Sequence, residues 1–88
     1  MPYSLDISGE ADKKFQKLKN RNKHQLDIID GKIRQILDNP YHFKPLRGDM
    51  HGARRVHIDK PFVLTYEIIE SKKAVRILDY GHHDDIYD

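Results

Sequence analysis

Residues 53–80, with the sequence ARRVHIDKPFVLTYEIIESKKAVRILDY, contain three β-prone runs separated by turn signals. The runs are residues 53–58, 62–69 and 74–80, and the second is the most β-prone in the chain. Lys60-Pro61 and the polar segment 70–73 separate them. Connections this short favour antiparallel neighbours, so the stretch predicts a three-stranded meander.

The residues before the meander change from a strand pattern to a helix pattern. Residues 3–7 alternate apolar and polar side chains, which is typical of a half-buried strand. Apolar side chains then recur at helical spacing over residues 10–22 and 26–37, until Asn39-Pro40 ends the second helix. We therefore expect an α+β fold in the order β-α-α-β-β-β. Its helical hairpin should pack on one face of a mostly antiparallel four-stranded sheet.

The composition limits the kind of protein. The chain has 88 residues, enough for a single domain over residues 1–88, and it has no cysteine for a disulfide or a thiolate metal site. No apolar run approaches the roughly 20 residues of a membrane-spanning helix. The first residues also lack the pattern of a signal peptide. We therefore expect a cytoplasmic protein without a membrane partner.

Positive charge is concentrated in one part of the chain. Residues 13–57 hold 12 Lys and Arg against 4 Asp and Glu, whereas the remaining residues hold 4 against 10. Lys13, Lys17 and Arg21, spaced by four, share one face of the first predicted helix. Such a face indicates either a polyanionic partner or an ordinary solvated surface.

Side-chain alternation in residues 53–58 defines an open face of the sheet. Val56 and Ile58 are expected to face the helices, so Arg55 and His57 share the opposite face. A cation beside an imidazole fits a functional site, and it fits an ordinary solvated sheet face equally well.

The chain closes with residues 80–88, YGHHDDIYD, which fit an acidic tail, a metal site or half of an active site. On an extended tail, His83 and Asp85 would share a face, and an imidazole with a carboxylate suits zinc or manganese. The sequence has no second dense cluster of ligands, because the other histidines are scattered. We therefore expect neither a metal nor another cofactor.

Three segments together resemble the RelE/ParE superfamily of toxins. Residues 44–58 look like the family's loop-to-strand segment, and residues 62–66 like its apolar strand ending in tyrosine. Residues 81–87 look like the end of the family's sequence, where a glycine and a catalytic residue are followed by an apolar and an aromatic residue. The element order agrees too, so the resemblance spans nearly the whole chain. Its closest branch resembles the YafQ-type messenger RNA interferases.

The resemblance implies a toxin of a type II toxin–antitoxin module, neutralised by a cognate antitoxin protein. Most such toxins enter the ribosomal A site and cleave messenger RNA without a metal. The 2′-hydroxyl attacks the adjacent phosphate, and the 5′-oxygen leaves. Two alternatives stay open: a ParE-like inhibitor of DNA gyrase, which needs no histidine pair, and a catalytically inactive binding protein. No specific DNA binding is expected without the antitoxin.

The resemblance also implies the site residues. His83 matches a catalytic histidine, His57 a strand histidine, and Tyr87 the closing aromatic residue. The predicted catalytic set is His57, His83, Tyr87 and Arg55, and the predicted RNA-binding set is Lys44, Arg47, Lys13, Lys17 and Arg21. Which histidine is the acid cannot be read from the sequence, and our hypothesis takes His57 as the base and His83 as the acid.

One position departs from the family pattern. This chain has Asp79 two residues before Gly81, at a position where the YafQ branch has an arginine. The nearest arginine is Arg76, which strict alternation places on the opposite face. Arg55, Arg47 or Lys44 could substitute for the missing phosphate-binding cation.

Overall fold

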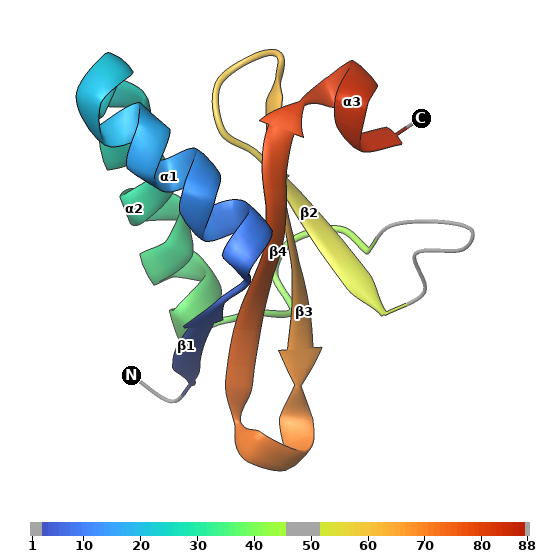
Figure 1. Cartoon of the computed structure of the whole chain (residues 1–88). Helices are drawn as coiled ribbons and strands as arrows, with labels where there is room; N and C mark the ends of the chain where they lie inside the picture. Colours follow the sequence, from blue (N-terminus) through green and yellow to red (C-terminus); the bar gives the residue numbers. More distant parts are fainter. Residues whose placement is uncertain (1–2, 46–51, 88) are drawn as a thin grey trace.

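The computed structural model describes residues 3–45 and 52–87 (Figure 1). They form a four-stranded sheet in the order β1 (Ser4–Ile7), β4 (Ala74–His82), β3 (Phe62–Ile69) and β2 (Ala53–His57). β1 is parallel to β4, and the other neighbours are antiparallel. The expected α+β class and the meander of the last three strands are confirmed.

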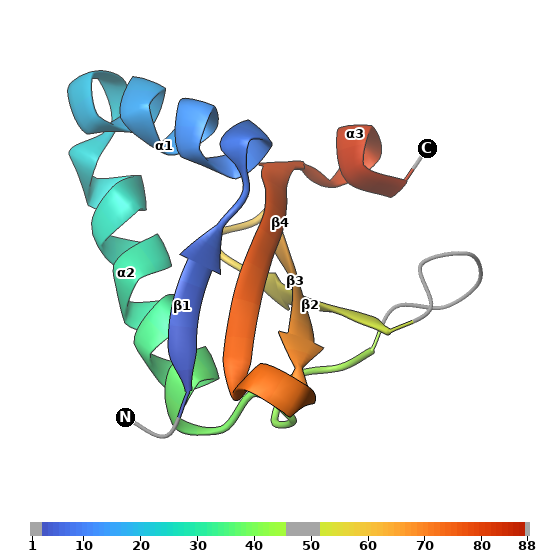
Figure 2. The ribbon, with the colours of Figure 1, turned by 60° about the horizontal axis from the view of Figure 1, so that its bottom comes forward.

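The helical elements lie on both sides of this sheet. The helices α1 (Gly9–Arg21) and α2 (Lys23–Asp38) cover one face, and the short helix α3 (His83–Tyr87) lies on the other side, at one end (Figure 2). A 3-10 turn, η1 (Glu70–Lys72), joins β3 to β4. Within the described ranges, no helix has both the length and the apolar character needed to cross a membrane.

Two capping residues define the hairpin. The Ser8 hydroxyl accepts a hydrogen bond from the Ala11 amide (3.1 Å) and donates one to the Leu78 carbonyl (2.6 Å), so it starts α1 and ties it to β4. Asn22 ends α1 and caps α2, where its side-chain oxygen accepts a bond from the Gln25 amide (3.1 Å). The join between the helices is therefore a single residue.

The core lies between the hairpin and the sheet. Its fully buried members include Ile29 and Ile36 from α2, Leu64 and Tyr66 from β3, and Ile77 from β4. Burial of such side chains supplies most of the folding free energy in a domain of this size.

Two hydrogen bonds pair polar side-chain groups of this core. The buried Tyr66 hydroxyl donates to the Pro40 carbonyl (2.6 Å), and burial raises the pKa of Tyr66 to about 12. The Gln25 amide donates to the Tyr80 hydroxyl (2.8 Å) inside the core. Val56 and Ile58 are buried as alternation predicts.

A bulge in β4 corrects the predicted position of Arg76. Thr65 pairs with Asp79, but the next residue of β3, Tyr66, pairs with Ile77, so Leu78 is the extra residue. The bulge shifts the alternation by one residue. Arg76, which pairs with Glu67 on the open side, therefore shares the face of Asp79, and the expectation of opposite faces was wrong.

The end of the chain also differs from the expectation. β4 extends to His82, and the following residues form the helix α3 instead of an extended tail. His83 and Asp85 are two residues apart on a helix, where such neighbours do not face each other. The shared face that would have joined these two side chains in a metal site is therefore absent.

Candidate active site

The open face of the sheet brings His57 and His83 together. Their rings are nearly parallel, with an angle of 13° between the planes and 6.5 Å between the centroids. The approach follows from the register, because His57 pairs with Val63 and Val63 pairs with Gly81, just before α3. The His83 amide donates to the Pro61 carbonyl (2.8 Å), which holds the start of α3 beside the β2–β3 turn.

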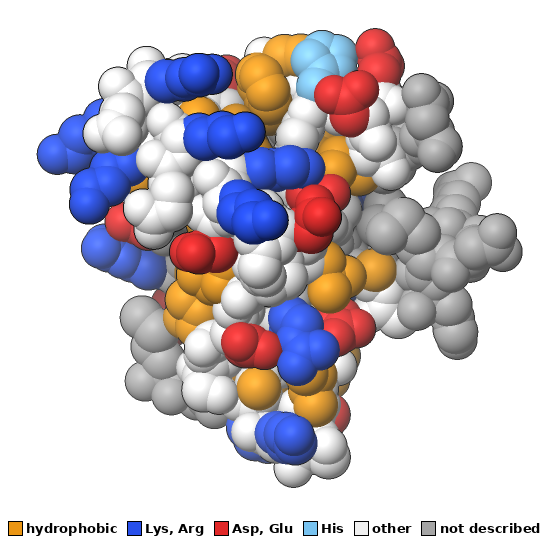
Figure 3. All heavy atoms as spheres, viewed as in Figure 1, with side chains coloured by type: hydrophobic (Ala, Val, Ile, Leu, Met, Phe, Trp, Pro, Cys, Tyr) orange, Lys and Arg blue, Asp and Glu red, His pale blue; other side chains and the backbone are white. Residues whose placement is uncertain are grey.

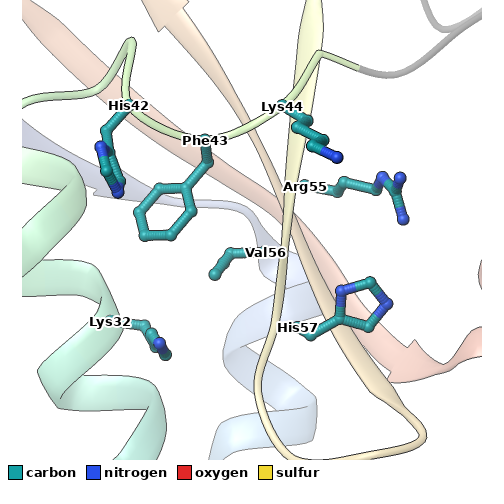
Figure 4. Close-up of a pocket in the computed structure, with 7 residues that line it drawn as sticks. All are labelled: Lys32, His42, Phe43, Lys44, Arg55, Val56 and His57. Atoms are coloured by element: carbon teal, nitrogen blue, oxygen red, sulfur yellow. The ribbon is translucent and has the colours of Figure 1, made fainter.

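Arg55 lies one alternation before His57 on the same face of β2. The Arg55 amide donates to the Lys44 carbonyl (3.1 Å), which holds the loop after α2 along the edge of β2. In Figure 4 the side chains of Lys44, Arg55 and His57 extend on the same side of β2. Three side chains named in the predicted site are therefore neighbours along the edge strand.

A pocket of about 400 Å³ adjoins these side chains (Figure 4). The described residues that line it are Lys32, His42, Phe43, Lys44, Arg55, Val56 and His57. This lining contains three permanent cations and no carboxylate. Such a composition suits a polyanion, and the ring of Phe43 adds an apolar wall.

Sequence reasoning did not place four of these lining residues in the site: it missed Lys32, His42 and Phe43, and it assigned Val56 to the core. His42 and Phe43 belong to the loop that leaves α2, and their rings meet edge to face, 5.0 Å between centroids. An aromatic pair in a loop just before a basic strand was the available signal. Lys32 carried no signal, because a lysine on an amphipathic helix is an ordinary solvated residue.

The electrostatics favour an uncharged His57. Desolvation lowers the pKa of His57 below its ordinary value, and the positive charges of Arg55, His83 and Lys60 lower it further. At neutral pH the imidazole is therefore neutral and able to accept a proton.

The carboxylate of Asp84 lies beside the imidazoles at the start of α3. It is 3.7 Å from Nδ1 of His83 and 3.8 Å from Nδ1 of His82. Both distances exceed a good hydrogen bond, and Asp84 is largely exposed, so each contact is weak.

The other predicted RNA-binding residues do not join this pocket. Lys13, Lys17 and Arg21 lie exposed on α1, in the helical layer, where Lys and Arg gather on the surface (Figure 3). Arg47 lies outside the described residues. Tyr87 is the last residue of α3, and its side chain also lies outside the described part.

Among the described residues, no group of three or more His, Asp or Glu side chains is arranged to hold a metal ion. Asp84 and Asp85 lie in the first turn of α3, and Asp84 lies beside His82 and His83.

Comparisons with known proteins agree with this fold. Residues 6–88 match the model of the ParE-like toxin of type II bacterial toxin–antitoxin systems. An uncharacterised protein of Methanosarcina mazei is 49% identical over 97% of this chain and 99% of its own length. A protein of Methanocaldococcus jannaschii, named as a candidate toxin, RelE4, is 44% identical over 97% of this chain and 90% of its own length.

Solved structures show the same architecture. The YoeB/ParE toxin from Agrobacterium tumefaciens has a TM-score of 0.85 at 18% identity, over 91% of this chain and 98% of that one. The toxin–antitoxin complex RelBE of E. coli has a TM-score of 0.79 at 25% identity, over 91% of this chain and 95% of that one. The DinJ–YafQ complex of E. coli has a TM-score of 0.78 at 20% identity, over 98% of this chain and 99% of that one.

The fold and the family model define the class: this is a toxin of the RelE/ParE superfamily. More narrowly, the chain belongs to the ParE-like toxin family of type II toxin–antitoxin systems. The resemblance read from the sequence is thereby confirmed.

Proposed function

We propose that the protein is a ribosome-dependent endoribonuclease that cleaves messenger RNA in the A site. The observation that carries this proposal is the His57–His83 pair, 6.5 Å apart on the open face of the sheet. A pair of imidazoles, one neutral and one protonated, supplies the base and the acid that cleavage by a 2′-hydroxyl needs.

The lowered pKa of His57 supports the role of base for this residue. In the proposed reaction, neutral His57 removes the proton of the 2′-hydroxyl, whose oxygen forms a bond to the adjacent phosphorus. The bond from phosphorus to the 5′-oxygen breaks, and protonated His83 gives its proton to that oxygen. The products are a cyclic phosphate and a free 5′-hydroxyl. Arg55, next to His57 on the same face, stabilises the extra negative charge of the phosphorane.

The pocket at the edge of β2 suits the RNA that flanks the cleaved bond. Lys44 and Arg55 supply positive charge on the side of His57, and on the other side of β2 Lys32 adds a third cation and Phe43 a partly buried aromatic ring (Figure 4). Arg47, in the same loop of the sequence, is proposed to add a phosphate contact. Tyr87, which follows His83 in α3, is proposed to orient His83, to donate to the phosphate or to stack on a base.

The proposed partners are the ribosome with its messenger RNA and a cognate antitoxin. The E. coli RelBE and DinJ–YafQ structures are toxin–antitoxin complexes, which supports an antitoxin for this chain. The exposed cations Lys13, Lys17 and Arg21 of α1 suit either ribosomal RNA or an acidic antitoxin segment. A ribosomal substrate places the activity in the cytoplasm.

The test is a translation reaction on a defined messenger, with primer extension to locate any cut. The wild-type protein should cleave within codons only when ribosomes are present. His83→Ala and His57→Ala should each lower cleavage by at least about 100-fold, the usual contribution of a general acid or base. His24→Ala removes an exposed histidine of α2 and should leave cleavage unchanged.

Cleavage without ribosomes, or cleavage that survives both substitutions, would refute the proposed mechanism. The second candidate function is gyrase inhibition, which the match to the ParE-like toxin model favours. A folded protein that cleaves no messenger but blocks DNA supercoiling would establish that function instead.

A further inference from the structure

One helix of the hairpin reaches the open face of the sheet through a single ion pair. Nζ of Lys14, on α1, lies 2.6 Å from Oδ1 of Asp79, on β4. The two side chains are 39% and 34% exposed, so the pair lies at the surface and not in the core. Asp79 is the position at which the YafQ branch has an arginine.

The local backbone explains how a helical residue reaches that face. β1 pairs with β4 only as far as Ile77, and the Ser8 amide then donates to the Ile77 carbonyl (2.9 Å) as the chain turns into α1. α1 therefore packs beside the second half of β4, beyond the end of β1. The bulge at Leu78 turns Asp79 to the open face, where Lys14 meets it.

The Lys14 ammonium lies near the backbone of Gly81, two residues before His83. A Cβ atom placed on Gly81 would be 3.8 Å from Nζ of Lys14 and 3.5 Å from Cδ1 of Ile86, on α3. Gly81 pairs with Val63, which pairs with His57. Two strand spacings of about 4.8 Å thus separate the backbones of Gly81 and His57. Gly81, with no side chain, adds no atom between Lys14 and the Ile86 side chain.

We propose that Lys14 binds a phosphate of the RNA at this site, and that Asp79 is a positioning residue that holds the ammonium on the open face. The inference rests on the proposed function and adds a cation to it. An ammonium has three donors, so Lys14 can keep Asp79 as a partner and still bind a phosphate oxygen. A half-exposed ion pair is weak, so a phosphate can compete for Lys14 at little cost. The cation that the family takes from β4 would here come from α1.

Arg76 is the competing source of that cation, and its contacts argue against it. Although the bulge places Arg76 on the open face, its Nε lies 2.8 Å from Asp6 and its Nη1 lies 3.6 Å from Glu67. Arg76 also lies at the β1 half of β4, away from Gly81 and α3. Among the described residues, two carboxylates flank Arg76, whereas Lys14 pairs with one and lies near Gly81.

The test measures binding separately from cleavage. The proteins are wild type, Lys14→Gln, Asp79→Asn and the matched control Lys19→Gln, which removes another exposed lysine of α1. The probe is a programmed ribosome whose messenger carries 2′-deoxynucleotides in the A-site codon, so that it binds without being cut. Affinity is titrated at several salt concentrations. Thermal unfolding of each free variant reports any structural effect.

If Lys14 binds a phosphate, Lys14→Gln weakens binding roughly tenfold or more. It also reduces the salt slope, d log K/d log[salt], by about 0.7, the value for one contact to a single strand. Asp79→Asn keeps the salt slope of wild type, because the Lys14 ammonium remains. It weakens binding less than Lys14→Gln does. The charge exchange Lys14→Asp with Asp79→Lys, which returns a cation from β4, restores most of the affinity.

A slope and affinity for Lys14→Gln equal to those of wild type would overturn the proposal. So would a loss of thermal stability without a loss of binding, because Lys14 would then only tie α1 to β4. If wild type cleaves the messenger and Lys14→Gln has the salt slope of wild type, only the role of Lys14 is refuted and the nuclease proposal stands. Binding without cleavage by wild type refutes the nuclease, and the slope still decides the role of Lys14. A wild type that does not bind refutes both.

Discussion

Replacing Tyr66 with phenylalanine should destabilise the protein and loosen the loop that lines the pocket. Tyr66 is fully buried, and its hydroxyl donates to the Pro40 carbonyl at 2.6 Å. Pro40 is buried too, at the start of the loop that carries His42, Phe43 and Lys44. The substitution keeps the ring and removes only the donor, so the buried carbonyl loses this partner.

Leaving a buried polar group unsatisfied costs about 1–3 kcal/mol. For a domain of this size, each kcal/mol lowers the Tm by roughly 4–8 °C. Urea unfolding followed by circular dichroism gives the free energy directly. Tyr41→Phe is the matched control, because its hydroxyl bonds the exposed Glu70, and it should stay within about 0.5 kcal/mol of wild type.

The reasoning would be refuted if Tyr66→Phe lost less than about 0.5 kcal/mol, because a buried, unpaired carbonyl costs more than that. Hydrogen exchange supplies a second readout. The amides of residues 41–45 should exchange faster in Tyr66→Phe, whereas those of β3 and β4 should change only with global stability. Equal changes everywhere would show that the hydroxyl does not anchor the loop.

Three further predictions concern charge and capping. Hydrogen bonds from Lys73, then Tyr41 and Tyr3, lower the pKa of Glu70 from 4.5 to about 2. The stabilising effect of the Glu70 carboxylate is therefore complete above pH 4.5 and lost as the pH falls towards 2. In Glu70→Gln, the free energy of unfolding should depend less on pH between pH 4.5 and 2 than in wild type. The charge of Arg55 helps to lower the pKa of His57, so Arg55→Gln should move the acidic limb of the pH–rate profile to higher pH, and an unmoved limb would exclude His57 as the base. Ser8→Ala should cost about 0.5–2 kcal/mol in chemical unfolding, the range for a lost helix cap, while Ser4→Ala, in an exposed strand, should change little.

The elements could be predicted because each has a strong local signal. The apolar stripes of α1 and α2 repeat at helical spacing, and the three strands of the meander are separated by short polar turns. The residues on the open face of β2 could be predicted from alternation alone. Because Val56 is buried, its neighbours Arg55 and His57 must lie on the opposite face. The meeting of His57 with His83 was implied only by the family resemblance.

The differences have physical reasons. Alternation assumes a regular strand, and nothing in the residues around Leu78 signals an extra residue. The predicted face of Arg76 was therefore wrong. α3 spans five residues and has no apolar period, so YGHHDDIYD gave no helical signal. Lys14 is one of several lysines on α1, and its contact with Asp79 depends on where β1 ends and on the bulge at Leu78, which the sequence does not signal.

The bulge lets one strand serve both the core and the site. Ile77 and Tyr80 are both buried on the hairpin side of β4, although they lie three residues apart, a spacing that a regular strand would place on opposite faces. Without the extra residue, burying Ile77 would turn Tyr80 to the open face, and its bond from Gln25 would be lost. With it, Tyr80 remains in the core while Asp79 and Gly81 lie on the open face, which also carries His57. The distortion in the sheet therefore links the packing of the hairpin to the chemistry we propose on the opposite face.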